Sequence, residues 1–205
     1  MTDATLKDTA VRRRISLPAI PVTVMLAIGW IVAMLVIAAL AEKIAPYGFT
    51  QLDLRNRLAA PGNAAHWLGT DELGRDMLAR LIYGGRLSLV IGILPVILAF
   101  CFGTSLGIIA GYVGGKLNTA IMRTVDVFYA FPSVLLAIAI SGALGAGITN
   151  SIVSLTIVFV PQITRVAESV TTGVRNMDFV EAARASGAGP FTIMRVHILG
   201  NVLGA

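Results

Sequence analysis

The pattern of apolar and polar positions divides the chain into long uncharged stretches separated by segments that carry charge. Because a helix needs about 20 apolar residues to cross a hydrocarbon core of about 30 Å, each uncharged stretch predicts a membrane span. The predicted spans cover about residues 22–41, 87–113, 120–145 and 148–164. We therefore expect an all-α, polytopic membrane helix bundle, with a membrane domain over residues 22–205.

Composition supports a membrane protein over a soluble domain. The 205 residues are 56% hydrophobic and only 13% charged, and the mean hydropathy is +0.83, outside the range of ordinary soluble domains. A net charge of +5 would suggest nucleic acid in a soluble chain, but Lys and Arg are scattered among the loops. We expect a lipid membrane and no nucleic acid as the partner.

The N-terminal segment, residues 1–21, is polar and carries Arg12, Arg13 and Arg14 just before the first apolar stretch. By the positive-inside rule this triplet predicts a cytoplasmic N-terminus. A cleavable signal peptide is the competing interpretation, but its apolar region would be shorter and would end at a small-x-small site. Four crossings then return the chain to the cytoplasm after residue 164.

Two features within the spans predict how the helices pack. Gly103, Gly107, Gly111 and Gly115 recur every four residues, which predicts a smooth stripe for close helix packing. Pro95 predicts a kink in the same span. The stripe indicates packing rather than a transport site.

The third and fourth predicted spans contain polar groups and a proline. Arg123 and Asp126 stand three residues apart, so they could pair on one helix face, either near a gate or as a salt bridge at the headgroup level. Pro132 predicts a break in the helix. Polar groups in a membrane helix normally face a protein interior or water; in the fourth span these are Asn150, Ser151, Ser154, Thr156 and Gln162.

The polar segment between the first two spans predicts an interfacial helix. Thr70 or Asp71 could cap it, and its apolar residues Leu73, Met77, Leu78, Leu81 and Ile82 would lie on one face. His66, Asp71, Glu72 and Asp76 are interpreted as a solvated cap and first helical turn, in preference to a metal site, because acidic residues are common there.

A polar, sharply punctuated segment follows the last span, and it predicts two short helices joined by an elbow over residues 178–199. Asp178 and Glu181 form a capping-box pattern, Gly187 can close the first helix, and Pro190 can open the second. Ala182, Ala183, Ser186 and Gly187 are small residues on adjacent turns. They predict a shallow surface where another protein can dock.

This segment resembles the cytoplasmic signature of the permease subunits of binding-protein-dependent ABC importers, which reads Glu-Ala-Ala, three residues, Gly, nine residues, Ile-x-Leu-Pro. Glu181, Ala182, Ala183, Gly187 and Leu199 match it, whereas His197 stands at the isoleucine and Gly200 at the proline. The pieces Leu-Gly-Thr-Asp (68–71), Gly-Arg-Asp (74–76), Met-Arg-x-x-Asp (122–126) and Ala-Phe-Pro (130–132) are similar to the dipeptide, oligopeptide and nickel branch of that family.

The resemblance implies a multi-pass permease of the cell inner membrane, in which residues 178–199 are the helices that couple it to an ATPase. It implies a homologous permease subunit, cytoplasmic ATP-binding subunits and a periplasmic solute-binding protein as partners, and peptides or nickel as substrate. Six spans are usual in this family and four are present, so the chain is expected to be truncated.

No catalytic or cofactor site is predicted. His66 and His197 fall on opposite sides of the membrane in this topology, and Cys101 is the only cysteine, so catalytic triads, disulfides and metal clusters are not expected. The alternative function is an ion-coupled secondary transporter or a channel subunit. That class expects charges deep inside the spans, and the predicted spans have none there.

Overall fold

The computed structural model describes residues 21–204, and within them it is helical, with no β-strand. One isolated bridge joins Thr70 to Asp76. The prediction of an all-α membrane bundle is confirmed. The N-terminal segment 1–21, with its arginine triplet, lies outside the described residues except for Pro21.

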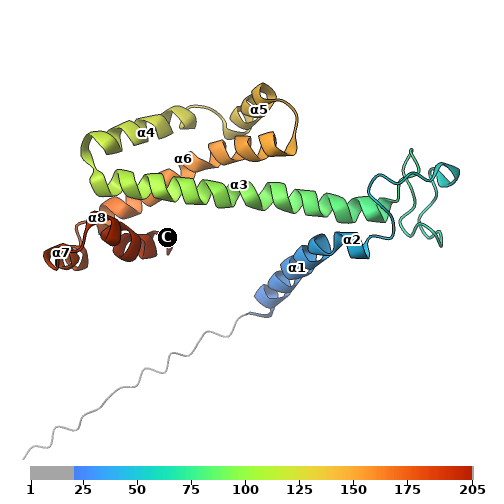
Figure 1. Ribbon diagram of the computed structural model, residues 1–205, viewed down its shortest axis with the longest axis horizontal. Coiled ribbons are helices and arrows are strands. Elements are labelled where there is room, and N and C mark those ends of the chain that lie inside the picture. Colours follow the sequence, from blue (N-terminus) through green and yellow to red (C-terminus); the bar gives the residue numbers. More distant parts are fainter. Residues whose placement is uncertain (1–20, 205) are drawn as a thin grey trace, which may run out of the picture.

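The first two long helices diverge from the end of the molecule that carries the segment connecting them (Figure 1). These are α1 (Val22–Ala39) and α3 (Met77–Val113), with α2 (Ala41–Ile44) and a loop that contains the short 3-10 helix η1 (Leu54–Asn56) between them. Ala38 is the only buried residue of α1. Such an apolar helix must lie against lipid or against other membrane helices.

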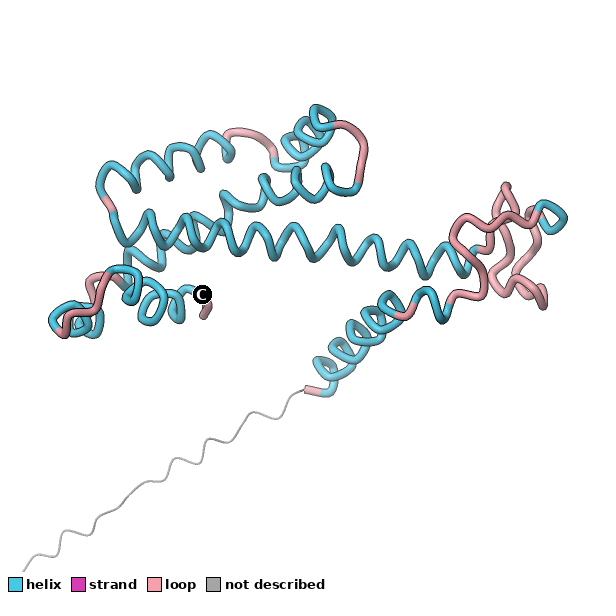
Figure 2. Tube along the Cα trace, in the orientation of Figure 1, coloured by secondary structure: helices cyan, strands magenta, loops and turns pink. Residues whose placement is uncertain are grey.

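Helix α3 is the longest helix, and α1, α4 (Gly115–Tyr129) and α6 (Ile148–Val174) all contact it. Its 37 residues correspond to about 55 Å at 1.5 Å per residue, more than the thickness of a hydrocarbon core. It begins ten residues before the predicted span 87–113. The helix extends into this more polar sequence because its hydrogen bonds do not require apolar side chains. The loop of residues 45–76 lies at its N-terminal end (Figure 2).

The predicted span 120–145 is broken into two helices. These are α4 (Gly115–Tyr129) and α5 (Ser133–Leu144), bent by 92° relative to each other. Pro132 stands at the N-cap of α5, where its missing N–H costs least. The break predicted at this proline is confirmed.

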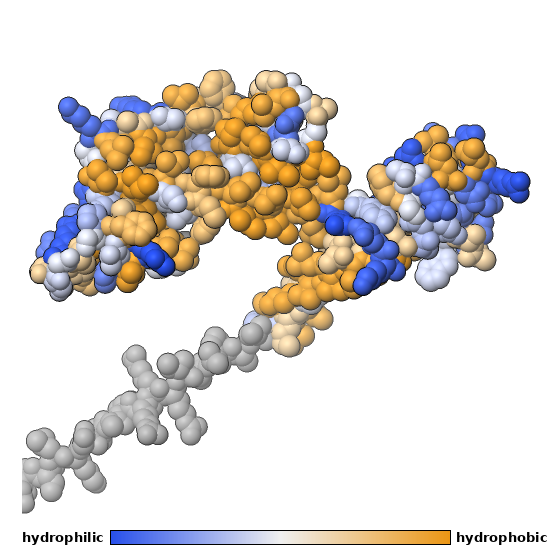
Figure 3. Space-filling model, viewed as in Figure 1, coloured by the Kyte–Doolittle hydropathy of each residue, from blue (hydrophilic) through white to orange (hydrophobic). Residues whose placement is uncertain are grey.

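Helix α6 (Ile148–Val174) returns along α3 and extends ten residues beyond the predicted span 148–164. Three helices of the described part, α1, α3 and α6, are long and apolar enough to cross a membrane, and the bent pair α4–α5 makes a fourth candidate. The surface is apolar over the middle of the molecule, and hydrophilic residues gather over the loop and at the opposite end (Figure 3).

The glycine stripe packs α3 against α6. A Cβ on Gly103 would lie 2.9 Å from the Cβ of Ile163, and one on Gly111 would lie 2.7 Å from the Cβ of Thr171. Such distances are too short for real Cβ atoms, so only glycine allows the two backbones to approach this closely. The stripe is confirmed at Gly103, Gly107 and Gly111. It is wrong at Gly115, which begins α4 and where an added Cβ would meet no atom within 4 Å.

The predicted interfacial helix is not a separate element, because its later residues (Met77, Leu78, Leu81 and Ile82) form the first turns of α3. The caps assigned to Thr70 and Asp71 are wrong. Residues 70–76 form a loop, and α3 begins at Met77 with Asp76 as its N-cap, whose Oδ2 accepts the backbone N–H of Ala79 at 2.7 Å. Gly74 has a φ of +76° and lies against the backbone of Asp53. A Cβ at this position would clash with the carbonyl oxygen of Asp53. A partner so distant in sequence leaves no sign in the local pattern.

The predicted pair of Arg123 with Asp126 is also wrong. Asp126 pairs with Arg165 of α6, whose guanidinium also lies over the ring of Tyr129, 4.6 Å from its centroid. The contact joins α4 to α6, so it holds the bent segment to the α3–α6 pair. Spacing within one helix could not reveal this partner.

Candidate functional site

The segment after α6 folds as the predicted helical hairpin, which comprises α7 (Asp178–Ala185), α8 (Pro190–Thr192), the π-helical segment η2 (Ile193–Ile198) and α9 (Leu199–Val202). Gly187 has a φ of +86°, the left-handed conformation that glycine reaches without a steric penalty. The N–H of Ala188 donates to the carbonyl of Ala183 at 3.0 Å, which closes the first helix. Pro190 opens the second helix, as predicted.

The predicted capping box is wrong. The N-cap of α7 is Met177, and no side chain caps the helix, so Asp178 and Glu181 both lie within its first turn. The N–H groups of Val180 and Glu181 instead donate to the carbonyl of Met177. Both carboxylates still lie at the positive end of the helix dipole, and no hydrogen bond engages the Glu181 side chain within residues 21–204.

The hairpin is anchored by its buried face. Val180, Ile193 and Ile198 are fully buried and pack with Ile108 of α3 and Ala167 of α6 in one hydrophobic cluster. Burying each large aliphatic side chain contributes about 1.5–3 kcal/mol. The hairpin is therefore joined to the ends of α3 and α6 through a packed core. A displacement of the hairpin would displace the ends of both helices with it.

The five signature residues divide between the surface and this cluster. Glu181, Ala182 and Gly187 are exposed, so they are available to a partner. Ala183 and Leu199 are partly buried and pack against the cluster. The motif thus contains residues of two kinds, some exposed on the hairpin surface and others that pack the hairpin against the cluster.

Three apolar side chains that the sequence interpretation missed are exposed on the hairpin. They are Phe179, Phe191 and Val196, with 42%, 71% and 61% of their surface accessible. The ring of Phe179 lies 6.4 Å from that of His197. A phenylalanine in each of two short helices that carry polar residues is the signal that could have indicated two of them.

Two arginines hold the hairpin end of α3. Arg175 donates to the carbonyl of Gly111 at 2.8 Å, and the guanidinium of Arg184 lies 5.4 Å from the ring centroid of Tyr112. Cations close to the C-terminus of a helix also stabilise it through the helix dipole. Arg175 is the C-cap of α6, so its bond joins α6 to α3. Arg184 joins α7 to α3 at Tyr112, which packs against the apolar cluster.

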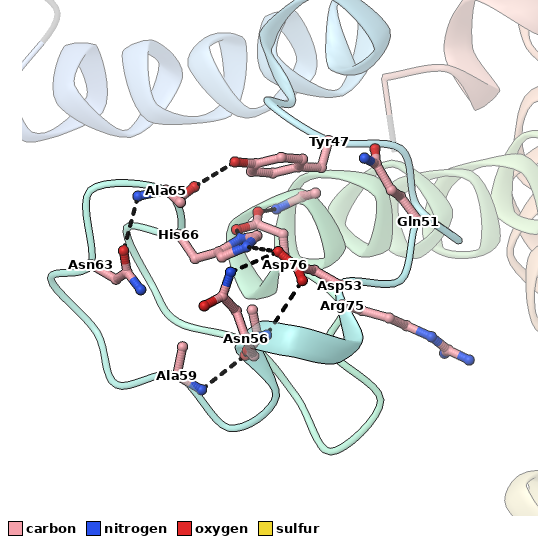
Figure 4. Close-up of polar contacts among 12 residues, drawn as sticks. Tyr47, Gln51, Asp53, Asn56, Ala59, Asn63, Ala65, His66, Arg75 and Asp76 are labelled. Atoms are coloured by element: carbon pink, nitrogen blue, oxygen red, sulfur yellow. Dashed lines mark hydrogen bonds and ion pairs between the residues drawn. The ribbon is translucent and has the colours of Figure 1, made fainter.

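At the other end of α3, the loop of residues 45–76 encloses a polar cluster around His66 (Figure 4). His66 Nδ1 lies 3.0 Å from Asp76 Oδ1, and its Nε2 lies 3.5 Å from Asp53 Oδ2. The hydrogen bond with Asp76 raises the pKa of His66 above its usual 6.5. His66 and Asp76 are buried, so their interpretation as solvated is wrong, although Asp76 does cap a helix, α3.

No group of three metal-ligating side chains with the geometry to hold an ion is found within residues 21–204. Asp71 instead accepts backbone N–H groups of Arg75 and Leu73 and pairs with Arg80. The bond from Arg75 is the main cause of a pKa for Asp71 below its usual 3.8. The acidic residues of this loop serve its fold.

Several of the polar residues predicted in the fourth span bond within the chain. The buried hydroxyls of Ser154 and Thr156 donate to the carbonyls of Asn150 and Ile152, at 2.7 Å each. The Asn150 amide donates to the carbonyls of Leu144 and Gly145 at the end of α5. Gln162 is exposed, so it can face another chain or water.

A helix bundle with membrane-length helices and a packed terminal hairpin defines a class of multi-pass membrane proteins, and comparison with known proteins identifies the family. Residues 103–205 match the family of binding-protein-dependent transport system inner membrane components. The chain belongs to this family, whose members are transport permeases and not enzymes. The predicted family is confirmed.

Named relatives place the chain within the family. It is 41% identical over 173 residues to a dipeptide transport system permease protein of Alkalihalophilus pseudofirmus, covering 84% of this chain and 57% of the relative. It is 39% identical over 170 residues to a glutathione transport system permease protein of Pectobacterium atrosepticum, covering 83% and 56%. A dipeptide permease protein of Haemophilus influenzae is 37% identical, covering 85% and 61%. The chain spans about half the length of the curated relatives it matches.

Proposed function

We propose that this chain forms part of the translocation path of an ATP-driven importer, which takes up peptides delivered by a periplasmic solute-binding protein. Its partners would be a homologous permease subunit and paired cytoplasmic ATP-binding subunits. The family match over residues 103–205 carries the proposal, and the names of the relatives favour small peptides as substrate. Nickel is the second candidate substrate, from the resemblance of the loop motifs.

The hairpin is the proposed coupling site, with Glu181, Ala182 and Gly187 at its surface and Ala183 and Leu199 within its packing. Its anchorage on α3 and α6 supports this role, because a docking element can move the spans only if it is packed against them. The exposed Phe179 and Phe191 extend the surface available to an ATP-binding subunit. Aromatic side chains are enriched in protein interfaces.

Variants at Glu181 test the coupling site. Because Glu181 makes no capping bond, Glu181→Gln removes its charge without altering the helix start. We expect less ATP-binding subunit to co-purify and peptide uptake to fall. The matched control is Asp178→Asn, since Asp178 is an exposed acid of the same first turn. Normal uptake and co-purification in both Glu181→Gln and Glu181→Ala would contradict this role.

We also propose that the N-terminus and the hairpin face the cytoplasm, as the arginine triplet and four crossings imply. A membrane-impermeant thiol reagent on intact cells tests this orientation in a Cys101→Ala background. Asn63→Cys and Ser186→Cys are suitable because both residues are exposed. Reaction at 63 alone is expected, and reaction at 186 alone would reverse the orientation.

An ion-coupled transporter or channel subunit is not favoured. That class expects ionisable side chains deep within the spans. Helices α1 and α5 carry none, and those of α3 and α6 (Arg80, Arg86, Arg165 and Glu168) lie within the ten residues nearest one helix end. Arg123, in the middle of α4, is the exception. Uptake that persists in everted or energised vesicles without ATP, driven by an ion gradient alone, would support this alternative.

A further inference from the structure

Three segments of the chain meet at the imidazole of His66 (Figure 4). Asp53 is the N-cap of η1, Asp76 is the N-cap of α3, and the ring of Tyr47 lies 4.7 Å from the ring of His66. Only 2% of the His66 surface is accessible. One buried side chain therefore connects the loop to the start of the longest helix.

The chemistry of the partners requires a proton on each ring nitrogen. Nδ1 faces Asp76 and Nε2 faces Asp53, and an ionised carboxylate can only accept hydrogen bonds. A neutral imidazole has one N–H and one lone pair, so one carboxylate would then face a lone pair. The observed arrangement is complete only with the imidazolium.

Among the described residues, Asp53 and Asp76 are the charged side chains that bond to the His66 ring, and Arg75 points away from it (Figure 4). Arg80 pairs with Asp71, and the Nε of Arg57 donates to the carbonyl of Glu72 at 2.7 Å. The hydroxyl of Tyr47 donates to the carbonyl of Ala65 at 2.8 Å.

We propose that His66 is a proton-dependent clasp, which fastens the η1 segment of the loop to the N-terminus of α3 and loosens when the imidazole becomes neutral. The link to Asp76 is the shorter one, and Asp76 is itself buried and bonded to α3. Asp53 is more distant and partly exposed. The Nε2 proton is therefore the one that is lost, and the η1 segment is the part that loosens.

The direction of the pH effect follows from the pKa of His66. The bond with Asp76 raises this pKa most, burial opposes the rise, and the bond with Asp53 adds to it. Because the folded-state pKa lies above the unfolded value of 6.5, the stabilisation is complete below pH 6.5. It is lost as pH rises through the raised pKa.

Hydrogen exchange of the full chain in nanodiscs tests the clasp. The readout is the protection of the Arg55 and Asn56 amides, which donate to Asp53 Oδ1, normalised at each pH to the exchange rate of an unstructured peptide. Between pH 6 and pH 9 we expect protection to fall about tenfold, the value of one charge-assisted hydrogen bond. A flat profile in the native protein would refute the clasp.

Two variants make the test specific. His66→Gln has no titrating ring, so its low protection should be independent of pH. His197→Gln removes the other of the two histidines and should retain the native profile. A pH dependence that survives His66→Gln, or that disappears in His197→Gln, would assign the effect to another group.

A titration of the native chain keeps the proposal testable if His66→Gln fails to fold. The ¹³Cε1 shifts of labelled histidine report both rings, and the His66 signal should titrate above pH 6.5 together with the loss of protection. A titration below pH 6.5 would overturn the proposal. The readouts concern the loop alone, so they remain valid whatever the transported solute is.

Discussion

Gly107 of α3 lies so close to Ala167 of α6 that a Cβ on the glycine would be 2.6 Å from the Cβ of the alanine. The same Cβ would lie 2.5 Å from the carbonyl oxygen of Thr164. The α3–α6 contact is thus made by backbone against backbone. Ala167 also belongs to the cluster that anchors the hairpin, so helix packing and hairpin anchorage share this position.

Gly107→Ala should separate α3 from α6 and loosen the hairpin. Because the nearest atoms are backbone and Cβ atoms, which cannot rotate away, we expect a loss of about 1–3 kcal/mol, the usual cost of overpacking. Thermal unfolding in detergent measures it. Gly92→Ala is the matched control, since Gly92 lies on the same helix with no atom within 4 Å of its added Cβ. Equal stability of the two variants would contradict the close contact.

Arg165 and Asp126 are each 47% exposed, so their pair should contribute about 1 kcal/mol or less to stability. Arg165→Lys keeps the charge but loses the planar group over Tyr129, whereas Arg165→Gln loses both contacts. A double-mutant cycle with Asp126→Asn measures the coupling. A coupling of several kcal/mol would mean that lipid or a partner chain covers the pair.

The sequence predicts the elements that depend on local chemistry. Membrane-length apolar stretches, the break at Pro132 and the elbow at Gly187 were all predicted, because each depends on residues within one or two turns. Helix ends were less accurate. Helices α3 and α6 continue into polar sequence, since helical hydrogen bonds do not depend on an apolar surround.

Contacts between distant segments account for the errors. Asp126 bonds to a residue 39 positions away, and Asp53 contacts His66 from 13 positions away, so neither partner follows from a periodic pattern. The signature motif predicted which residues gather at the hairpin. It could not distinguish the exposed Glu181 from the packed Leu199, because burial is decided by α3 and α6.

Asp71 makes the loop sensitive to acid. Its pKa is lowered by the N–H groups of Arg75 and Leu73 and by the charge of Arg80, so its stabilisation is present above pH 3.8 and is lost as pH falls through the lower folded-state value. We expect the native loop to open in that range and Asp71→Asn to show a weaker acid transition. Trp67 reports the change by fluorescence in a Trp30→Phe background, because the chain has two tryptophans.

An acid transition of equal size in Asp71→Asn would assign the opening to other carboxylates. Asp53 also has a lowered pKa, mainly through Asn56, so Asp53→Asn is the second variant to compare. Comparing the two variants distinguishes acid opening of the turn that precedes α3, which Asp71 stabilises, from acid opening of η1, which Asp53 caps.

Gly187 supplies the last prediction, because the elbow of the hairpin depends on its backbone and not on its neighbours. Its φ is +86°, and an added Cβ would meet no atom within 4 Å. Gly187→Val should therefore cost about 1–2 kcal/mol through the left-handed conformation alone. It should tilt α7 away from α8 and reduce the amount of ATP-binding subunit that co-purifies with the protein.

Gly189→Val is the matched control for this strain. Gly189 has a φ of −69° and the same open surroundings, so the identical substitution two residues later should leave both stability and co-purification near native. Gly187→Asn should fall between the two, because asparagine tolerates the left-handed region better than valine does. If Gly187→Val and Gly189→Val behaved alike, a positive φ at the elbow would not be what sets the geometry of the hairpin.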